Sequence, residues 1–320
     1  MASSKRILVL VHPFFHPKHG RNRAATEFDV WRTLRRLGHE VEIAAAENDL
    51  RRFDRQLADF QPDLVFNLLE EFRGEGIFDF HLVSYLEALG IPYTGCNPRG
   101  LAISRNKYWA TQVAVGAGLA APRSAVGSRA LAPAYPAVVK LNREHASMGM
   151  SQASVVRDLR QLRKCRSRME VAFDGELIVQ EFIPGREVSV AVVGNDRLQA
   201  LAPWSLRLPS PKHIATPRVK FNAKYRQRLS IRSGRLTDLA LVQALQKAAR
   251  RAFSVLDLNG YARFDYRISS SGKPFLIDVN ANPCLSKDED FARAASGVGI
   301  SYPELIERII KLGITYQPRR

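Results

Sequence analysis

Residues 261–283 read YARFDYRISSSGKPFLIDVNANP. Two mainly apolar runs, residues 261–268 and residues 274–279, flank the turn-forming sequence Ser270-Ser271-Gly272. Strand-forming runs separated by a short stretch that contains glycine are typical of a β-hairpin. The sequence therefore predicts a pair of antiparallel strands in the last part of the chain.

Four polar side chains interrupt the apolar pattern of this hairpin. Residues two apart on a strand share a face, so Arg263 lies beside Asp265, and Asp278 lies beside Asn280. In an antiparallel pair both sets converge into an oxygen-rich site of the kind that Mg²⁺ prefers; Mn²⁺ suits the same ligands. Arg263 would then neutralise a transferring phosphoryl group or an oxyanion. The alternative is a surface hairpin with solvated charges, but Asp and Asn form strands poorly, which favours the metal site.

The first third of the chain alternates strand and helix patterns. Apolar runs predict strands at residues 7–11, 41–45, 64–69 and 91–93, and helical spacing is found at residues 27–37 and 81–89. This rhythm is typical of a parallel sheet with helical crossovers, in which ligands bind at the carboxyl ends of the strands.

The remainder of the chain has a mixed pattern. Strands are expected at residues 136–140, 152–156, 177–181 and 188–193, and helices at 107–116, 159–168, 237–256 and 303–312. The polar, basic stretch 205–233 is expected to be a long and partly mobile segment. We divide the chain into an N-terminal α/β domain (residues 1–102), a small central lobe (103–186) and a C-terminal lobe with the metal and substrate site (187–320).

Composition limits the class of protein. The chain has 320 residues, 46% of them hydrophobic, which is enough for two or three compact lobes. No apolar run is long enough to cross a bilayer, so no membrane association is expected. The three cysteines form no CxxC pair, which favours a reducing cytoplasm over a disulfide scaffold or a zinc site.

The net charge of +17 is concentrated in residues 157–168 and 218–235. A basic surface can bind nucleic acid or any other anion, ATP included. A solvated basic face is the ordinary explanation of such runs, so nucleic acid is not expected as a partner.

The hairpin residues carry a family resemblance. Arg263-Phe264-Asp265 followed by Asp278-Val279-Asn280-Ala281-Asn282-Pro283 resembles the R-x-D … [DE]-x-N-x-x-P signature of ATP-grasp enzymes, in particular the D-alanine–D-alanine ligase family. The resemblance implies an ATP-grasp fold, in which a parallel-sheet N-terminal domain precedes two α+β lobes that clasp ATP. It assigns magnesium to Asp265, Asp278 and Asn280, and the acyl-phosphate step to Arg263.

Two lysines continue the resemblance upstream. Ala137-Val138-Val139-Lys140 is similar to the V-V-K of the family, and Asn106-Lys107 to its D-K, with Asn in place of Asp. Both lysines are implied to bind ATP phosphates, for which a compact point charge is suited. Without the family, each would be read as a solvated surface lysine.

Residues 177–188, LIVQEFIPGREV, look like the hinge segment of the family. The resemblance implies that the stretch of Gln180, Glu181, Phe182 and Ile183 meets the adenine and that Glu187 holds the ribose hydroxyls. An extended backbone offers the donor and acceptor that an adenine edge needs, and a carboxylate accepts from hydroxyls. Pro184-Gly185 alone would indicate only a turn.

The remaining implied catalytic residues lie on loops and near the first helix. In the loop 142–149, Ser147 and Gly149 match the phosphate loop of the family, while His145 is read as an exposed loop residue. Ala223-Lys224-Tyr225 resembles a mobile-loop A-K-Y, whose Lys meets the γ-phosphate and whose Tyr closes the first amino-acid site. Glu27 is implied to bind a substrate ammonium, although an acid in a first helical turn also simply stabilises the helix dipole.

The resemblance therefore implies an ATP-dependent ligase that joins a small carboxylate to an amine through an acyl phosphate, and both substrates are expected to be amino acids. Asp288, Glu289 and Asp290 follow the hairpin and would repel an acceptor carboxylate, so a different amino acid, a dipeptide or a small amine stays open as the acceptor. A basic relative that binds polyanions without ligase chemistry is the third reading. The resemblance also allows a homodimer.

Overall fold

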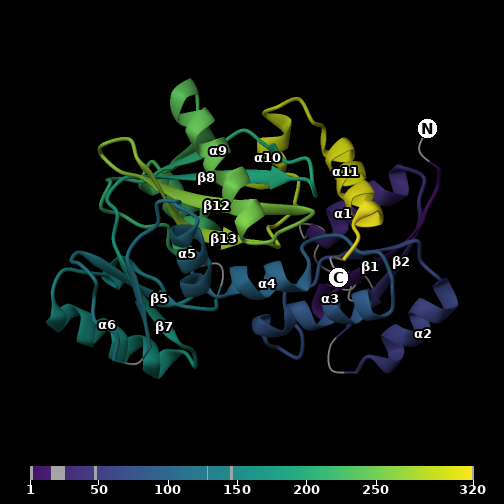
Figure 1. Cartoon of the computed structure of the whole chain (residues 1–320), viewed down its shortest axis with the longest axis horizontal. Coiled ribbons are helices and arrows are strands. Elements are labelled where there is room, and N and C mark those ends of the chain that lie inside the picture. The colour runs from purple at the N-terminus through teal and green to yellow at the C-terminus, as the bar shows by residue number, and fades with distance from the viewer. Residues whose placement is uncertain (1–2, 16–25, 47–48, 128, 145–146, 319–320) are drawn as a thin grey trace.

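The computed structural model describes residues 3–15, 26–46, 49–127, 129–144 and 147–318. Within these ranges the strands form three sheets, one near the N-terminus, one small and one large. Figure 1 shows the N-terminal sheet and the large sheet at opposite sides of the molecule, with helix α4 (Pro98–Arg105) between them. None of the helices in the described ranges has the length and apolarity needed to cross a bilayer.

The N-terminal sheet is parallel, as predicted. Its order is β2 (Glu40–Ala45), β1 (Arg6–Val11) and β3 (Leu64–Asn67), and both pairs run parallel. The helices of this part are α1 (Thr26–Arg36), α2 (Arg51–Phe60) and α3 (Asp79–Ala88). The strand expected at residues 91–93 is reduced to a single bridge between Val65 and Tyr93.

Two short helices lead out of this sheet, and an asparagine starts each. Asn97 caps α4 by accepting from the Gly100 amide, and Asn106 caps α5 (Lys107–Gly116) by accepting from the Trp109 amide. Such caps satisfy amide donors that have no partner within the helix. The cap at Asn106 ends α4 and fixes Lys107 as the first residue of α5.

The small sheet is antiparallel, with the order β4 (Ser124–Val126), β7 (Leu177–Glu181), β5 (Ala137–Leu141) and β6 (Val155–Val156). Helix α6 (Leu159–Ala172) covers it with buried Leu162, Cys165 and Met169. The strand predicted at residues 152–156 is wrong in its first part. Gln152–Ser154 form a 3₁₀ turn, because Ser151 and Ser154 cap each other, and only β6 pairs with β5.

The large sheet is also antiparallel. Its order is β11 (Arg232–Arg235), β10 (Trp204–Arg207), β8 (Arg186–Val193), β12 (Tyr261–Ile268) and β13 (Pro274–Asn280), and β9 (Gln199–Ala200) pairs with β8. Helix α9 (Leu239–Val255) packs on this sheet. Helices α10 (Asp290–Ser296) and α11 (Tyr302–Thr315) close the chain, and α11 packs beside α1 on the N-terminal sheet (Figure 1).

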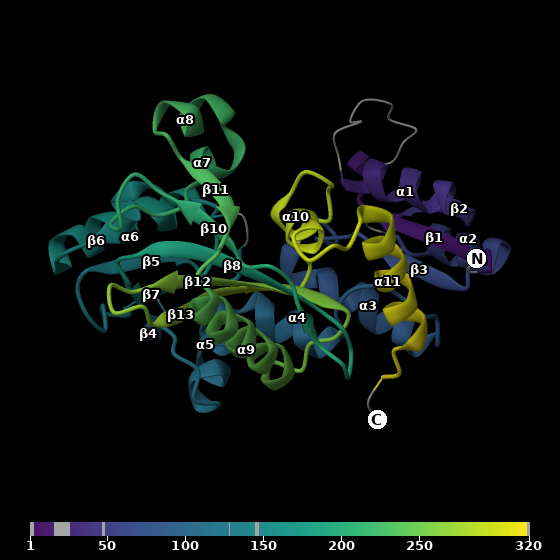
Figure 2. The ribbon, with the colours of Figure 1, turned by 90° about the horizontal axis from the view of Figure 1, so that it is seen from above.

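Residues 205–233, expected to be a long and partly mobile segment, contain regular secondary structure. They include most of β10, α7 (Pro217–Phe221), α8 (Ala223–Arg228) and the start of β11; their mobility stays a prediction. Buried Val219 and Ile231 form a small apolar cluster there, against which Tyr225 packs. This small cluster gives the basic segment buried apolar contacts of its own. Figure 2 shows α7 and α8 standing out from the edge of the large sheet; residues 208–231 are called the α7–α8 segment below.

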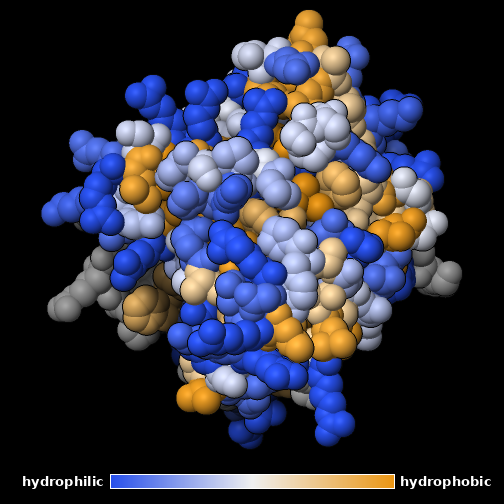
Figure 3. All heavy atoms as spheres, turned by 90° about the vertical axis from the view of Figure 1, so that its left-hand side faces the viewer, coloured by the Kyte–Doolittle hydropathy of each residue, from blue (hydrophilic) through white to orange (hydrophobic). Residues whose placement is uncertain are grey.

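The first basic stretch lies on α6. Arg157, Arg160, Arg163, Lys164 and Arg168 are exposed. Hydrophilic side chains cover much of the molecular face at this end, with smaller apolar patches between them (Figure 3). This is the arrangement expected of a solvated basic face. The three sheets fall one in each of the predicted domains, whose boundaries stay a prediction.

Candidate active site

The β12–β13 hairpin brings its four polar residues onto one face. Asp265 is the direct cross-strand partner of Asp278, and Arg263 is the partner of Asn280. Directly opposed side chains project to the same side, with Cβ atoms about 4.5–5.5 Å apart. The convergence predicted from the alternation of the two strands is therefore present.

Cationic side chains accompany both carboxylates. Arg263 donates from Nε and Nη2 to the two carboxylate oxygens of Asp265, each at 2.9 Å. This pairing raises the pKa of Arg263, which stays charged. Lys107 Nζ lies 3.8 Å from Asp278 Oδ1. The hairpin face is thus a cluster of mixed charge, in which each aspartate has a cation beside it.

The donor set fits a magnesium ion that keeps other ligands. Asp265, Asp278 and Asn280 offer two carboxylates and one amide oxygen on one face. No group of three or more His, Cys, Asp and Glu side chains that could hold a metal occurs among the described residues. Mg²⁺ is usually held by one or two carboxylates together with waters and substrate phosphates, so an incomplete protein shell is what such a site requires.

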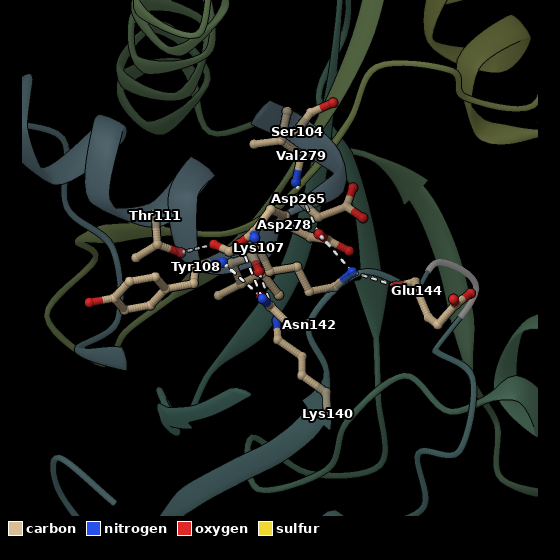
Figure 4. A network of polar contacts seen from close by, with 12 residues as sticks. Ser104, Lys107, Tyr108, Thr111, Lys140, Asn142, Glu144, Asp265, Asp278 and Val279 are labelled. Atoms are coloured by element: carbon tan, nitrogen blue, oxygen red, sulfur yellow. Dashed lines mark hydrogen bonds and ion pairs between the residues drawn. The ribbon is translucent and has the colours of Figure 1, made fainter. Parts of the chain in front are cut away.

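Two buried lysines approach the hairpin from different elements (Figure 4). Lys107 is 6% exposed and donates to the Glu144 carbonyl, and Lys140 is 8% exposed and donates to the Ile277 carbonyl at 3.0 Å. Burial lowers the pKa of both lysines, that of Lys140 to about 8, while the charge of Asp278 acts in the opposite direction. Solvated surface lysines are excluded as the explanation. Buried cations beside an acidic pair are suited to a polyanionic ligand.

Asn142 links the start of α5, which carries Lys107, to the end of β5, which carries Lys140. Sequence reasoning gave this residue no role. Its side chain accepts from the Tyr108 amide at 3.0 Å and donates to Asn106 Oδ1 at 3.2 Å, and its carbonyl accepts from the Lys107 amide. Asn142 is fully buried and follows β5 directly. A polar residue immediately after an apolar strand was the signal that could have indicated this role.

The hinge segment has fewer open backbone groups than its sequence suggests. The Gln180 side chain is buried and donates to Ser124 Oγ, which is a structural contact. The Glu181 and Phe182 amides donate to the carbonyls of Arg123 and Pro136. Among the residues proposed to meet adenine, Ile183 is therefore the one whose amide no described residue accepts.

Glu187 has a partner that sequence reasoning missed. It is half-buried on β8, and Arg267 lies directly opposite on β12, with Nη1 at 2.8 Å from Glu187 Oε1. The Ala215 amide donates to the same oxygen at 3.3 Å. Burial raises the pKa of Glu187, and Arg267 counteracts this.

Lys224 and Tyr225 lie on α8, away from the hairpin contacts. Lys224 is exposed, and Tyr225 is half-buried with the Arg228 guanidinium 5.4 Å from its ring centre. Neither residue makes a hydrogen bond, an ion pair or a ring contact with the hairpin within the described part of the chain. Lys220 of the same segment adds a small effect to the lowered pKa of Lys107, after the larger effects of burial, Asp278 and Arg105.

Near the start of α1, the predicted Glu27 is half-buried, and burial raises its pKa. Its neighbour Asp29 makes the longer-range contacts, accepting from Ser286 Oγ at 3.0 Å and pairing with Lys287 Nζ at 3.3 Å. These bonds join α1 to the segment that follows the hairpin. Ser147 has a positive φ of 61° in its loop; His145 lies outside the described residues.

Comparisons with known proteins identify relatives of this chain. A family model described as the D-ala D-ala ligase C-terminus matches residues 123–311, more than half of the chain. The uncharacterized protein y4sG of Sinorhizobium fredii is 29% identical over 294 residues, 87% of this chain and 84% of that protein. A D-alanine–D-alanine ligase of Halalkalibacterium halodurans is 30% identical over 298 residues, 89% of this chain and 92% of that enzyme.

A solved structure of a D-alanine–D-alanine ligase has a similar fold. The D-alanine–D-alanine ligase from Bacillus anthracis complexed with ATP has a TM-score of 0.74 at 21% identity, covering 97% of this chain and 98% of that one. The predicted fold class, a parallel-sheet N-terminal part followed by two α+β lobes, is confirmed.

Proposed function

Since the chain belongs to the D-alanine–D-alanine ligase family of the ATP-grasp superfamily, we propose that it uses ATP and Mg²⁺ to activate a small carboxylate and join it to an amine. The observation that carries the proposal is the cross-strand pair of Asp265 and Asp278, with Arg263 and two buried lysines around it. ATP-dependent peptide-bond formation is the activity of the family.

In the first step a substrate carboxylate attacks the γ-phosphoryl group of ATP, giving an acyl phosphate and ADP. Lys107 and Lys140 neutralise phosphate oxygens, since both are buried cations beside the hairpin. Asp265, Asp278 and Asn280 would hold the magnesium ion, which when bound neutralises charge on the phosphates. Phosphoryl transfer depends mainly on positioning and on such charge neutralisation.

In the second step an amine attacks the acyl carbon and phosphate leaves. Arg263 neutralises the developing oxyanion from its place beside the acidic pair. Glu27 is proposed to bind the ammonium of the first substrate, and the α7–α8 segment, through Lys224 and Tyr225, to exclude water from the acyl phosphate. Ser147 would contact phosphate from its loop.

The nucleotide is proposed to lie along the hinge, with its adenine at the backbone of residues 180–183 and its ribose at Glu187. The half-buried carboxylate of Glu187 offers Oε2 to the ribose hydroxyls while Oε1 accepts from Arg267.

The test is ADP and phosphate release with Mg²⁺ and ATP, screened over pairs of amino acids and small amines, with the product identified by mass spectrometry. Release that depends on both a carboxylate and an amine is the expected result. An absence of release with every pair, in a protein that binds ATP, would contradict ligase activity.

The acids that follow the hairpin bear on the choice of acceptor. Asp290, one of these acids, is half-buried. Burial raises the pKa of its carboxyl group, and the positive charge of Arg263 partly counteracts this rise. We therefore keep an acceptor other than D-alanine as the second candidate, and the same screen distinguishes the two. A homodimer and a cytoplasmic location stay predictions, the first of which sedimentation velocity tests.

A further inference from the structure

The guanidinium of Arg267 is buried at a meeting point of three chain segments. Arg267 lies on β12 and is 3% exposed. Its Nη1 donates to Glu187 Oε1 at 2.8 Å, and its Nη2 donates to the Gly185 carbonyl at 2.7 Å. Both acceptors belong to the end of the hinge and the start of β8. Nothing in the proposed chemistry so far uses this arginine.

The same guanidinium also holds the loop that leads into α7. Nη2 donates to the Pro211 carbonyl at 2.8 Å, and both terminal nitrogens donate to the His213 carbonyl, at 3.0 and 3.1 Å. Helix α7 begins at Pro217, a few residues further along the chain. One side chain therefore ties the root of the α7–α8 segment to the nucleotide hinge.

Two further contacts close this junction. The Gly185 amide donates to the Pro211 carbonyl at 2.9 Å, and the Ala215 amide donates to Glu187 Oε1 at 3.3 Å. The Arg267 guanidinium also lies 4.7 Å from the centre of the Phe182 ring. The hinge residue Phe182, the ribose-facing Glu187 and the loop 211–215 are thus connected through a single planar cation. A lysine offers a point charge and cannot reproduce this fork of donors.

We propose that Arg267 is a positioning residue that orients Glu187 for the nucleotide ribose and couples nucleotide binding to closure of the α7–α8 segment. The proposal rests on the proposed function in that it places the nucleotide at the hinge. Because the hinge and the root of the segment share the same donor, a nucleotide that fixes Glu187 also fixes the loop that carries α7 and α8. Arg267 acts through Glu187 and the loop, and it does not touch the reacting atoms.

Three variants test this role. Arg267→Met removes the donors but leaves Glu187 half-buried without its cation, which can impair folding. The double variant Arg267→Met with Glu187→Gln removes both charges of the pair, and its reference is Glu187→Gln alone, because Glu187 is itself assigned to the ribose. Arg267→Lys keeps the positive charge but loses the planar set of N–H donors. The matched control is Arg123→Met, which breaks an arginine–glutamate pair at the same hinge, Arg123 with Glu181 at 3.0 Å, in which the arginine side chain is 64% exposed.

Two readouts distinguish positioning from a merely structural role. The first is the affinity for a non-hydrolysable ATP analogue by calorimetry, together with KM for ATP and kcat. The second is the rate of tryptic cleavage within the α7–α8 segment, with and without the analogue, followed by mass spectrometry. Its exposed Arg218, Lys220 and Lys224 provide cleavage sites. Circular dichroism and thermal unfolding confirm that each variant is folded.

In the wild-type protein the analogue is expected to slow cleavage of the segment. The double variant should bind the analogue about tenfold or more weakly than Glu187→Gln alone, as for the loss of a buried charge-assisted contact, and should lose the protection. Its KM for ATP should rise more than its kcat falls. Arg267→Lys should fall between the two, and Arg123→Met should behave as wild type.

A folded double variant with the affinity and protection of Glu187→Gln alone, or a folded Arg267→Lys variant with wild-type affinity and wild-type protection, overturns the proposal. Failure of the ligase function is seen separately. A wild-type protein that binds the analogue and shows the Arg267 dependence, but forms no product with any acceptor, contradicts the proposed function and supports the positioning role. A wild-type protein that binds no nucleotide overturns both.

Discussion

Asp265 of β12 and Asp278 of β13 are direct partners across the hairpin, so their carboxylates project from the same face of the large sheet. Two like charges directly opposite each other on a sheet destabilise it unless cations compensate. Arg263 and Lys107 supply such compensation in the protein, and a divalent cation would add to it. The pair of carboxylates therefore destabilises the sheet on its own, and it is suited to binding a metal ion.

Replacing either aspartate by asparagine should abolish metal-dependent turnover. Asp265→Asn and Asp278→Asn keep the side-chain shape and remove one ligand charge each, so we expect ADP release to fall by about 100-fold or more. The measurement is ADP release as a function of Mg²⁺ concentration. Asp59→Asn, an exposed acid on α2, is the control and should retain wild-type rates. A variant at Asp278 that keeps the wild-type Mg²⁺ dependence would refute the assigned ligands.

Nucleotide affinity should depend on pH through Lys140. Burial lowers the pKa of this lysine to about 8. Its charge is therefore present below about pH 8 and lost as the pH rises through that value, which weakens phosphate binding. In EDTA, we expect the affinity for ATP to decrease by up to about tenfold for each pH unit above this pKa.

The matched variant for this prediction is Lys140→Arg, because an arginine keeps its charge throughout the range. Its affinity should change little between about pH 7 and about pH 9, which lie about one unit on either side of the lysine pKa. Calorimetric titrations at fixed ionic strength measure both proteins. A parallel decrease of affinity in the wild type and the variant would assign the pH dependence to another group.

A methyl group at Gly260 should strongly destabilise the fold. Gly260 precedes β12 with φ of +69°, and a Cβ atom there would lie 2.6 Å from the Gly95 carbonyl oxygen. Gly272, in the hairpin turn, has a similar φ of +80° but no atom within 4 Å of a Cβ. We expect Gly272→Ala to cost about 1 kcal/mol of unfolding free energy from the backbone conformation alone. Gly260→Ala should cost about 3 kcal/mol or more, because backbone must also move.

Urea denaturation of the two glycine variants measures this difference. Since both backbones are left-handed, the comparison isolates the contact between Gly260 and Gly95. Equal losses in the two variants would show that the close approach of these two segments does not contribute to stability.

The hairpin and its site were predictable because they depend on local periodicity. Alternation along two strands places Arg263, Asp265, Asp278 and Asn280 on common faces whatever the rest of the chain does. The parallel order of β1 and its neighbours followed from strand–helix alternation in the same way. The burial of Lys107 and Lys140, the two lysines proposed to bind phosphate, could not be predicted in this way, because it depends on contacts between separate elements.

The parts that sequence reasoning missed are pairings between distant residues. Arg267 and Glu187 meet only because β12 lies beside β8, and Asp29 and Lys287 only because α1 lies beside the segment after the hairpin. No spacing along the chain encodes either pair. The helices and strands within residues 205–233 were not predicted for a related reason. Their small apolar cluster is surrounded by basic residues, which lower the mean hydropathy of the stretch.

The acceptor preference should change when the acids after the hairpin are neutralised. Asp290 lies near Arg263, the cation that would attract an acceptor carboxylate, and Glu289 precedes it at the start of α10. Carboxylates of the protein that lie close to the carboxylate of an acceptor repel it and lower its affinity. The double variant Glu289→Gln with Asp290→Asn should therefore raise kcat/KM for D-alanine, relative to its amide, by about tenfold. Asp288→Asn, an exposed neighbour, should change the ratio less. An unchanged ratio in competition assays read by mass spectrometry would show that these acids do not select the acceptor.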